Sequence, residues 1–425
     1  MSRPPEAAGV GARRAALRLL DSVLRRGQPL ESALAASTAG LSPSDRGLAH
    51  AIAAIVLRWQ PDLDALIDSA TKRPLPPDAK ARMALRIALG QSLRLGTPGH
   101  AAISTVLPLL DGGPRKLVHG VFGTLDRRKA MLPEAPHLPD PVAMRWQALW
   151  GDTMVAAAGE ALADQPPIDL GLKDAGATDE WAQRLGGQSL APGHVRLPAG
   201  VKVDGLPGFD DGAWWVQDLA ASLPARLLPS GAHNVLDLCA APGGKTMQLA
   251  AAGASVTALD VSETRLARLT DNLRRTGLKA EMIAADALQW QPDTPYDAVL
   301  LDAPCSATGI FRRHPDVIHR VRPADIATMA EMQAALLARA AQWVKPGGTL
   351  IYCVCSLEQA EGEAQMQGID RLGLEVAPVL HDELPAGLVA DANGFVRTLP
   401  THLAAQGRLD GFFVARLRRK DQQRR

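Results

Sequence analysis

The spacing of apolar residues changes along this 425-residue chain, and each change predicts a different kind of structure. From about residue 10 to 132, apolar residues recur every three or four positions, as in AALRLLDSVL and GLAHAIAAIVLRW. That spacing is typical of amphipathic helices. Proline and glycine interrupt it at GLSPSDRG, KRPLPPDAK and GTPGH. This part of the chain therefore predicts an all-α domain of roughly six or seven helices.

A proline-rich stretch, MLPEAPHLPDP (131–141), marks the first boundary. After it the pattern is less regular. VAMRWQALWGDTMVAAAGEAL predicts helix, PPIDLGLK a short strand, and RLPAGVKVDGLPGFDDGAWWVQD strands and turns. We therefore expect three domains, over residues 1–135, 136–225 and 226–420, the middle one a small α+β connector.

From about residue 232, short apolar runs alternate with helical stretches. Strands are predicted for NVLDLCA, SVTALD, AEMIAAD, YDAVLLDAP and TLIYCVC. A long helix is predicted for PADIATMAEMQAALLARAAQWVKPGG. Such alternation predicts a doubly wound, parallel α/β sheet. GFFVARLRR and its neighbours near the C-terminus are expected to form an antiparallel edge.

Composition narrows the class of protein. Apolar residues make up 47% of the chain and there are four cysteines, so we expect packed cores without a disulfide framework. No run reaches the ~18 apolar residues of a membrane span. The N-terminal MSRPPEAAGVGARR has no apolar secretory segment. A cytoplasmic protein that does not bind membranes is expected.

The net charge of +1 conceals an asymmetry between the two halves of the chain. Residues 1–135 carry 19 Lys and Arg against 11 Asp and Glu, or +8, which leaves 27 against 34, or −7, for the remainder. A basic front half is typical of a protein that binds a polyanion such as RNA. A solvated basic helical surface is the alternative.

Ligands of a parallel sheet bind beyond the carboxyl ends of its strands. The first strand runs into DLCAAPGGK (237–245), whose glycines allow close approach of backbone amides to a ligand. Asp260, Asp286 and Asp302 end the next three strands. One such acid is commonly a helix cap, but three of them after a loop without G-x-G-x-x-G favour S-adenosylmethionine over a dinucleotide.

The segment IYCVCSLEQAEGE (351–363) holds Cys353 and Cys355. SLEQ predicts a capping box, with Ser356 as N-cap and Gln359 at N3, so that Cys355 would precede a helix N-terminus that lowers its thiol pKa. The acidic residues that follow are interpreted as helix-start chemistry. A C-x-C pair without neighbouring His or Cys is a poor zinc site, so no metal is expected. Cys353, like Cys239, is interpreted as core packing, and Cys355 as a nucleophile.

The loop after the fourth strand, LDAPCSATGIFRRHPDV (301–317), holds Cys305, Arg312 and Arg313. The two arginines suit RNA phosphates, and ordinary surface charge is the alternative.

Six segments, taken in order, resemble the Sun (Fmu) family of RNA cytosine-5 methyltransferases. They are VQDLAA, DLCAAPGGKT, ALDVSETRLARL, ADAL, DAVLLDAPCSATGIFRRHPD and KPGGTLIYCVCSLEQAEGE. DRGLAHAIAAIVLRWQPDLDALI resembles the NusB-like helical RNA-binding domain. The resemblance implies a multidomain protein: an all-α NusB-like domain, the connector, and an α/β Rossmann-like methyltransferase domain. It also implies methylation of a cytidine in 16S ribosomal RNA with S-adenosylmethionine, the cytidine being unpaired or flipped out of its stack. We expect a monomer.

The resemblance also assigns roles to residues. It implies Cys355 as the nucleophile and Cys305 as the cysteine that assists product release. In the mechanism that we expect, the Cys355 thiolate adds to carbon 6 of cytosine and Asp302 contacts the base edge. For the cofactor it implies Cys239, Ala240, Ala241, Pro242, Gly243, Gly244, Lys245, Asp260, Asp286 and Asp302.

Two departures from the family pattern stand out. Val354 replaces the threonine that often precedes the nucleophile, and LGLK (170–173) replaces L-R-x-N, which bears on the RNA contacts of the connector. Two rival functions also stay open. One is another methyltransferase, such as a DNA cytosine enzyme with Cys305 as the attacking thiol. The other is a non-catalytic RNA-binding or antitermination factor.

Overall fold

The computed structural model describes residues 9–421, which form two compact units. The helical unit runs through Asp164 and also takes in Phe311–Val321. The sheet unit contains Gln165–Ile310 and the chain from Arg322 onwards. No helix among residues 9–421 has the length together with the apolar content that a bilayer crossing requires.

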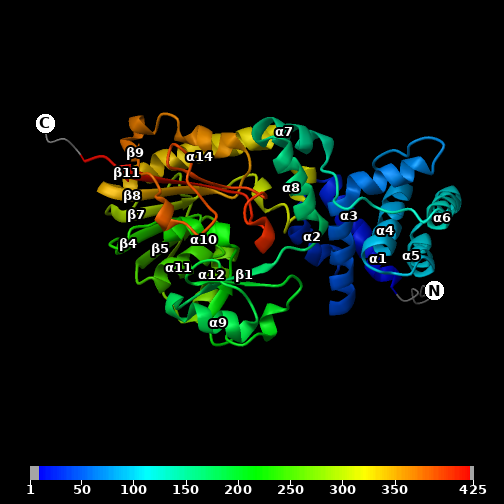
Figure 1. Ribbon diagram of the computed structural model, residues 1–425, viewed down its shortest axis with the longest axis horizontal. Coiled ribbons are helices and arrows are strands. Elements are labelled where there is room, and N and C mark those ends of the chain that lie inside the picture. The colour runs from blue at the N-terminus through cyan, green and yellow to red at the C-terminus, as the bar shows by residue number, and fades with distance from the viewer. Residues whose placement is uncertain (1–8, 422–425) are drawn as a thin grey trace. The chain divides into compact units, whose positions relative to one another are not determined.

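The helical unit begins with six α-helices, as the apolar spacing predicted. Each of the three interruptions read from the sequence falls at a helix boundary. Ser42, for example, caps the third helix by accepting a hydrogen bond from the Asp45 backbone amide at 3.1 Å. The apolar faces of these helices meet in one core, in which Leu19 and Trp59 are fully buried. The helices, blue to cyan in Figure 1, are α1 (Val10–Leu24), α2 (Leu30–Ser37), α3 (Pro43–Ser69), α4 (Lys80–Arg94), α5 (Gly99–Val106) and α6 (Gly112–Arg127).

Residues 136–164, which the sequence analysis placed in the connector, lie in the helical unit. They form α7 (Asp140–Trp150) and α8 (Asp152–Ala163), which are separated by Gly151 with a positive φ of 79°. The segment Phe311–Val321, including α13 (Val317–Arg320), packs in the same unit, where the Phe311 and Trp146 rings lie 5.2 Å apart. No sequence pattern predicted this insertion.

A three-stranded antiparallel sheet, called here the small sheet, is formed by the first strands in the sequence of the sheet unit. Its central strand is β1 (Ile168–Leu172), flanked by β2 (His194–Leu197) and β3 (Trp214–Val216), with α9 (Thr178–Leu185) alongside. Asp169 is fully buried and accepts two hydrogen bonds from the Arg196 guanidinium, each 2.6 Å long. This ion pair joins β1 to β2 inside the small sheet.

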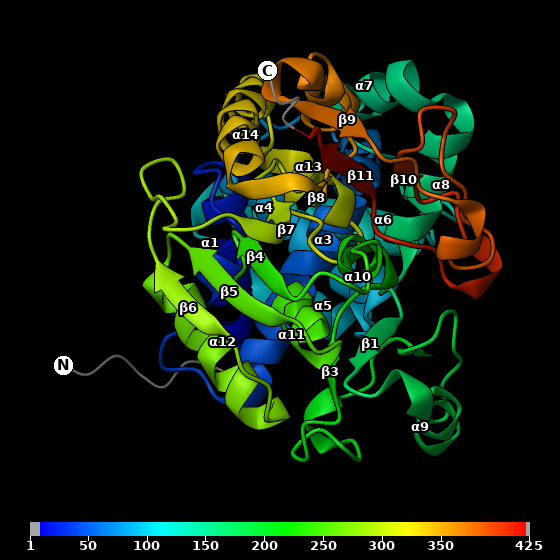
Figure 2. The same cartoon turned by 90° about the vertical axis from the view of Figure 1, so that its left-hand side faces the viewer.

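An eight-stranded mixed sheet, called here the large sheet, carries the strands predicted after residue 232. Its order along the main path is β10-β11-β8-β7-β4-β5-β6, and β9 pairs with β11. The five strands from β8 to β6 are parallel, whereas β9, β10 and β11 form the predicted antiparallel edge. Figure 2 shows this order across the sheet. The strands are β4 (Asn234–Leu238), β5 (Ser255–Asp260), β6 (Glu281–Ala284), β7 (Tyr296–Asp302), β8 (Val344–Val354), β9 (Leu374–Val376), β10 (Val396–Thr398) and β11 (Phe412–Arg419).

Helices cover both faces of the large sheet because side chains of its central strands alternate between two apolar layers. Along β7, Ala298 and Leu300 pack in the layer that includes α10 (Leu219–Arg226) and α11 (Gly244–Ala251). Their neighbours Val299 and Leu301 pack against α14 (Pro323–Trp343). The helix α12 (Glu263–Thr276) packs near β5 and β6. The carboxyl ends of the parallel strands thereby share one edge, where the predicted ligand loops lie.

Candidate active site

The loop between β4 and α11 turns sharply, and its turn depends on Gly243. This residue has φ 105°, and a Cβ atom there would lie 2.0 Å from Leu269 Cδ1 on α12. Only glycine avoids both the conformational strain and the collision. The loop residues Cys239–Lys245, predicted to bind the cofactor, are therefore held against α12.

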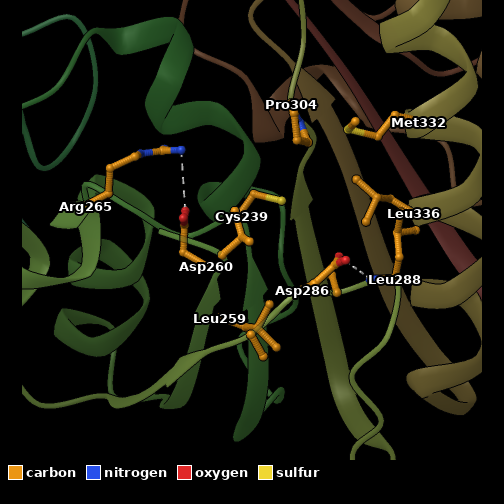
Figure 3. A pocket seen from close by; sticks show the side chains of 12 residues that line it. Cys239, Leu259, Asp260, Arg265, Asp286, Leu288, Pro304, Met332 and Leu336 are labelled. Carbon is orange, nitrogen blue, oxygen red and sulfur yellow. Dashed lines mark hydrogen bonds and ion pairs between the residues drawn. The ribbon is translucent and has the colours of Figure 1, made fainter. Parts of the chain in front are cut away.

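A cavity of about 280 Å³ opens beside this loop and brings two of the predicted acids together. Asp260 ends β5, is buried, and accepts hydrogen bonds from the backbone amides of Ala241 at 3.1 Å and Ser262 at 2.9 Å. Asp286 follows β6 and lines the same cavity (Figure 3). The rest of the lining is mainly apolar: Cys239, Leu259, Val261, Ala285, Ala287, Leu288, Pro304, Met332 and Leu336, together with Arg265.

Asp237, near the end of β4, is an acid that the sequence analysis used only to mark the start of the loop. It is completely buried, which raises its pKa to about 7. Its Oδ2 accepts a hydrogen bond from Thr246 Oγ1 at 2.6 Å, whereas Oδ1 has no hydrogen-bond partner among the described residues. A buried oxygen without a partner is costly, so this position suits a ligand that donates a hydrogen bond. Its position just before a glycine-rich loop was the available sequence signal.

Asp302 lies apart from that cavity, in a charged pair with Lys245. The Lys245 Nζ donates a hydrogen bond to Asp302 Oδ2 at 2.7 Å, and Cys353 Sγ lies 3.4 Å from Asp302 Oδ1. Burial lowers the pKa of Lys245, but the charge of Asp302, its hydrogen bond to Lys245 and the charge of Asp237 act together with Cys353 to outweigh burial, and the pKa is raised. Cys353 is fully buried on the strand, as predicted, and burial raises its pKa.

Cys305 and Cys355 lie on the loops that follow the adjacent strands β7 and β8, and their Sγ atoms are 3.4 Å apart. The hydrogen bond with Cys355, followed by burial, raises the pKa of Cys305 well above its ordinary value. Cys305 therefore keeps its proton, and its thiol can donate a hydrogen bond to the sulfur of Cys355.

The capping box predicted after Cys355 is wrong. Ser356 Oγ accepts a hydrogen bond from the Glu358 backbone amide at 3.1 Å, and only a short 3₁₀ turn, η5 (Gln359–Glu361), follows. No α-helix starts there, so no helix dipole acts on the thiol. The backbone instead leaves β8 in an irregular loop whose Cys355 carbonyl accepts a hydrogen bond from the Gly309 amide at 3.0 Å.

The acidic run is likewise not helix-start chemistry. Glu361 is fully buried and accepts hydrogen bonds from side chains of both cysteine loops. Glu363 forms an ion pair with Arg397, whose Nη2 lies 2.7 Å from Glu363 Oε2. The local pattern SLEQ could not reveal these partners, because they are distant in the sequence.

Comparison with known proteins identifies the family. Residues 224–418 match the family described as 16S rRNA methyltransferase RsmB/F, and residues 11–111 match the NusB family. The ribosomal RNA small subunit methyltransferase B of Xanthomonas campestris pv. campestris is 37% identical over 391 residues, covering 86% of this chain and 89% of that protein. The chain belongs to the ribosomal RNA small subunit methyltransferase B family. The family member from Cronobacter sakazakii is 32% identical and covers 97% of this chain and 99% of its own.

Solved structures support the fold of this family member. The crystal structure of PH0851 superposes with a TM-score of 0.71 at 22% identity, covering 98% of this chain and all of the other. The structure of NSun6 from Pyrococcus horikoshii gives a TM-score of 0.57 at 18% identity, covering 67% of this chain and 98% of the other. The resemblance to the Sun (Fmu) family and the predicted fold class are confirmed.

The two arginines predicted to contact RNA both lie on the segment Phe311–Val321 of the helical unit. Arg312 is 1% exposed, and its backbone carbonyl accepts a hydrogen bond from Arg58 Nη2 at 2.6 Å. A buried guanidinium does not reach a phosphate on the protein surface, so the structure argues against this role for Arg312. Arg313 is half-buried.

The family's arginine position in the connector corresponds to Gly171 of LGLK. A Cβ atom at Gly171 would lie 2.9 Å from the Trp215 Nε1 atom, so the indole occupies the space beside β1. Trp215 is 2% exposed and donates a hydrogen bond to Gln217 Oε1 at 2.7 Å. Lys173 donates to the Thr276 carbonyl at 2.7 Å. Residues of the substituted segment, together with Trp215, line a cavity of about 390 Å³.

Proposed function

We propose that this protein transfers a methyl group from S-adenosylmethionine to carbon 5 of a cytidine in 16S ribosomal RNA, with Cys355 as the nucleophile. One observation carries the proposal: the Sγ atoms of Cys305 and Cys355 lie 3.4 Å apart at the ends of adjacent parallel strands. Two thiols at one strand edge suit a reaction in which one attacks a base and the other assists its release. The family to which the chain belongs supports the same substrate.

The strand-end cavity fits the proposed cofactor. Asp260 is placed to accept hydrogen bonds from ribose hydroxyls, and the apolar lining suits an adenine ring. When bound, S-adenosylmethionine would supply a methyl group that is bonded to a positively charged sulfur. Attack by carbon 5 on this methyl group would release the sulfur as a neutral thioether.

Carbon 5 of cytosine is a weak nucleophile until the ring is activated. The Cys355 thiolate adds to carbon 6, which forms a carbon–sulfur bond and moves the electron pair of the double bond towards carbon 5. After methylation, carbon 5 loses its proton to a base, the carbon–sulfur bond breaks, and Cys355 leaves as a thiolate. The hydrogen bond from the protonated Cys305 stabilises that thiolate, which is the assistance to release that we assign to it.

Asp302 is assigned to the base edge. Each carboxylate oxygen accepts two hydrogen bonds, so the contacts to Lys245 and Cys353 leave capacity for the exocyclic amino group of cytosine. Because the target atoms are inaccessible within a stacked helix, the cytidine has to be unpaired or flipped out. We further propose that residues 1–135 bind RNA and that residues 226–420 catalyse.

The test compares wild type with Cys355→Ala and Cys305→Ala, using labelled S-adenosylmethionine and 16S ribosomal RNA lacking the modification. We expect Cys355→Ala to abolish methyl transfer while cofactor affinity, measured by calorimetry, is unchanged. Full activity in Cys355→Ala with loss in Cys305→Ala would assign the attack to Cys305 instead. Absence of cofactor binding in the wild type would favour the non-catalytic alternative.

A further inference from the structure

Glu361 is a buried carboxylate that both cysteine loops share. It lies at the end of η5 and is 0% exposed. Its Oε1 accepts a hydrogen bond from the Ser306 backbone amide at 2.8 Å, and its Oε2 accepts one from Ser306 Oγ at 2.5 Å. Ser356 Oγ donates to the same Oε2 atom. A single side chain therefore holds residues that are 50 positions apart in the sequence.

The two serines are the residues that directly follow the cysteines. Ser306 follows Cys305, and Ser356 follows Cys355. The Ser306 and Ser356 Oγ atoms also lie 3.3 Å apart, which places the two loops side by side at the carboxylate as well as at the thiols. Fixing each serine fixes the backbone next to each cysteine, so the position of Glu361 governs how far apart the sulfur atoms lie.

Two further contacts hold the carboxylate in place. Gln333 of α14 donates to Glu361 Oε1 at 3.2 Å and to the Pro304 carbonyl at 2.8 Å, so this helix also fixes the residue before Cys305. The Tyr352 hydroxyl of β8 donates to the Glu361 backbone carbonyl at 2.6 Å. The carboxylate is thus anchored to a strand and a helix of the large sheet, which makes it a rigid reference for two irregular loops.

We propose that Glu361 is a positioning residue that holds Cys305 and Cys355 at the separation required for attack and release. This role rests on the proposed function. Glu361 holds the thiols in position through Ser306 and Ser356, since no hydrogen bond joins it to either thiol among the described residues, and its charge also contributes to the raised pKa of Cys305.

The chemistry of the site requires a carboxylate. Four hydrogen bonds converge on its two oxygens, and an ionised carboxylate only accepts. In Glu361→Gln an amide NH₂ replaces one oxygen. It faces either the Ser306 amide and the Gln333 amide group, which donate, or the two serine hydroxyls, which must then turn from donors into acceptors, so the contacts to the loops are weakened. In Glu361→Asp the carboxylate is one methylene further from the serines. Both variants are expected to loosen the pair of thiols.

The separation of the thiols can be measured without RNA. Diamide oxidises two nearby thiols to a disulfide and takes up their two electrons and two protons, and peptide mass spectrometry quantifies the Cys305–Cys355 cross-link. We expect Glu361→Gln to slow this cross-linking by about tenfold or more, because disulfide formation demands specific geometry. Glu331→Gln, an equal change of charge at an exposed position on α14, is the control and is expected to react like the wild type.

All variants are compared well below their melting temperatures, so that global unfolding does not contribute. Ser306→Ala and Ser356→Ala each remove one side-chain donor and serve if Glu361→Gln does not fold. Slower cross-linking in either serine variant supports the proposal. Cross-linking at the wild-type rate in every folded variant of this set would overturn it.

A second measurement separates positioning from the proposed function. In methyl transfer, Glu361→Gln is expected to lower kcat about tenfold or more while KM for S-adenosylmethionine stays unchanged, because the cofactor cavity does not include Glu361. An equal loss of cofactor affinity would mean a general structural role and would contradict the proposal. A wild-type protein without methyl transfer would refute the proposed function, whereas the cross-linking result would still decide whether Glu361 positions the thiols.

Discussion

Cys305 and Cys355 face each other across two loops, with their Sγ atoms 3.4 Å apart. The strand register explains why they meet. Asp302 of β7 pairs with Cys353 of β8, so the two parallel strands end at the same level and each cysteine follows within three residues. Parallel strands bring residues that are distant in the sequence to one edge of a sheet.

The first prediction concerns release of the methylated base. Replacing Cys305 with alanine removes the hydrogen bond that stabilises the departing Cys355 thiolate, so elimination slows while attack continues. We expect Cys305→Ala to accumulate a protein–RNA adduct that survives denaturing electrophoresis. The double variant Cys305→Ala/Cys355→Ala is the control, and an adduct that persists in it would show that another residue attacks the base.

The strands and helices of the large sheet were predictable because the pattern of apolar residues within each short segment determines them. NVLDLCA, SVTALD and YDAVLLDAP are apolar runs of strand length, and the structure has β4, β5 and β7 in them. The positions of Asp260 and Asp302 at the ends of β5 and β7 were also predicted, although Asp302 does not line the cavity that holds Asp260. A parallel sheet with short connections leaves little freedom in where the strand ends lie.

The features that the sequence did not predict all depend on distant partners. Ser356 was expected to cap a helix, but the buried carboxylate of Glu361 and the Glu358 amide bind its hydroxyl instead. Arg312 was expected at the surface, yet its segment packs in the helical unit. In both cases tertiary contacts override a local motif, and no periodicity or spacing records them.

A second prediction tests the turn after β4. Gly243→Ala is expected to destabilise the fold by about 3 kcal/mol or more, since it adds backbone strain at φ 105° and a collision with Leu269. Gly253 is the matched control: it has φ 91° but no atom within 4 Å of an added Cβ, so Gly253→Ala adds strain alone, about 1–2 kcal/mol. Urea unfolding of the two variants measures the difference. Equal losses would show that the contact with Leu269 yields easily.

The third prediction concerns the buried ion pair of the small sheet. Arg196→Met leaves the Asp169 carboxylate buried and without its main partner, which typically costs about 3–5 kcal/mol. Arg274→Met breaks the exposed pair with Asp271, in which the two side chains are 73% and 69% exposed, and should cost less than about 1 kcal/mol. Chemical denaturation compares the two variants. A loss below 1 kcal/mol for Arg196→Met would mean that water reaches Asp169.

The buried carboxylate of Asp169 is also expected to make the stability of the protein sensitive to acid. Burial alone raises its pKa, but the hydrogen bonds and charges of Arg196 and His194 outweigh burial and hold the pKa below its ordinary value of 3.8. The pair therefore contributes stability above pH 4, and this contribution is lost as the pH falls below that value. Arg196→Met should lose less stability than the wild type between pH 5 and pH 3.

The last prediction concerns Asp237, whose pKa is raised by folding, whereas that of Asp169 is lowered. Burial raises its pKa from 3.8 to about 7, so between these values the folded protein keeps a proton that the unfolded chain has released. The stabilisation from this site is therefore complete below pH 4 and is lost as the pH rises through 7, by up to about 4 kcal/mol.

Asp237→Asn is neutral at every pH and keeps an oxygen for the Thr246 hydroxyl. Without cofactor, we expect this variant to gain stability relative to the wild type as the pH rises from 5 to 8. A wild-type-to-Asp237→Asn difference that is constant with pH in urea unfolding would mean that Asp237 is ionised throughout, and that its free oxygen is hydrated before any ligand binds.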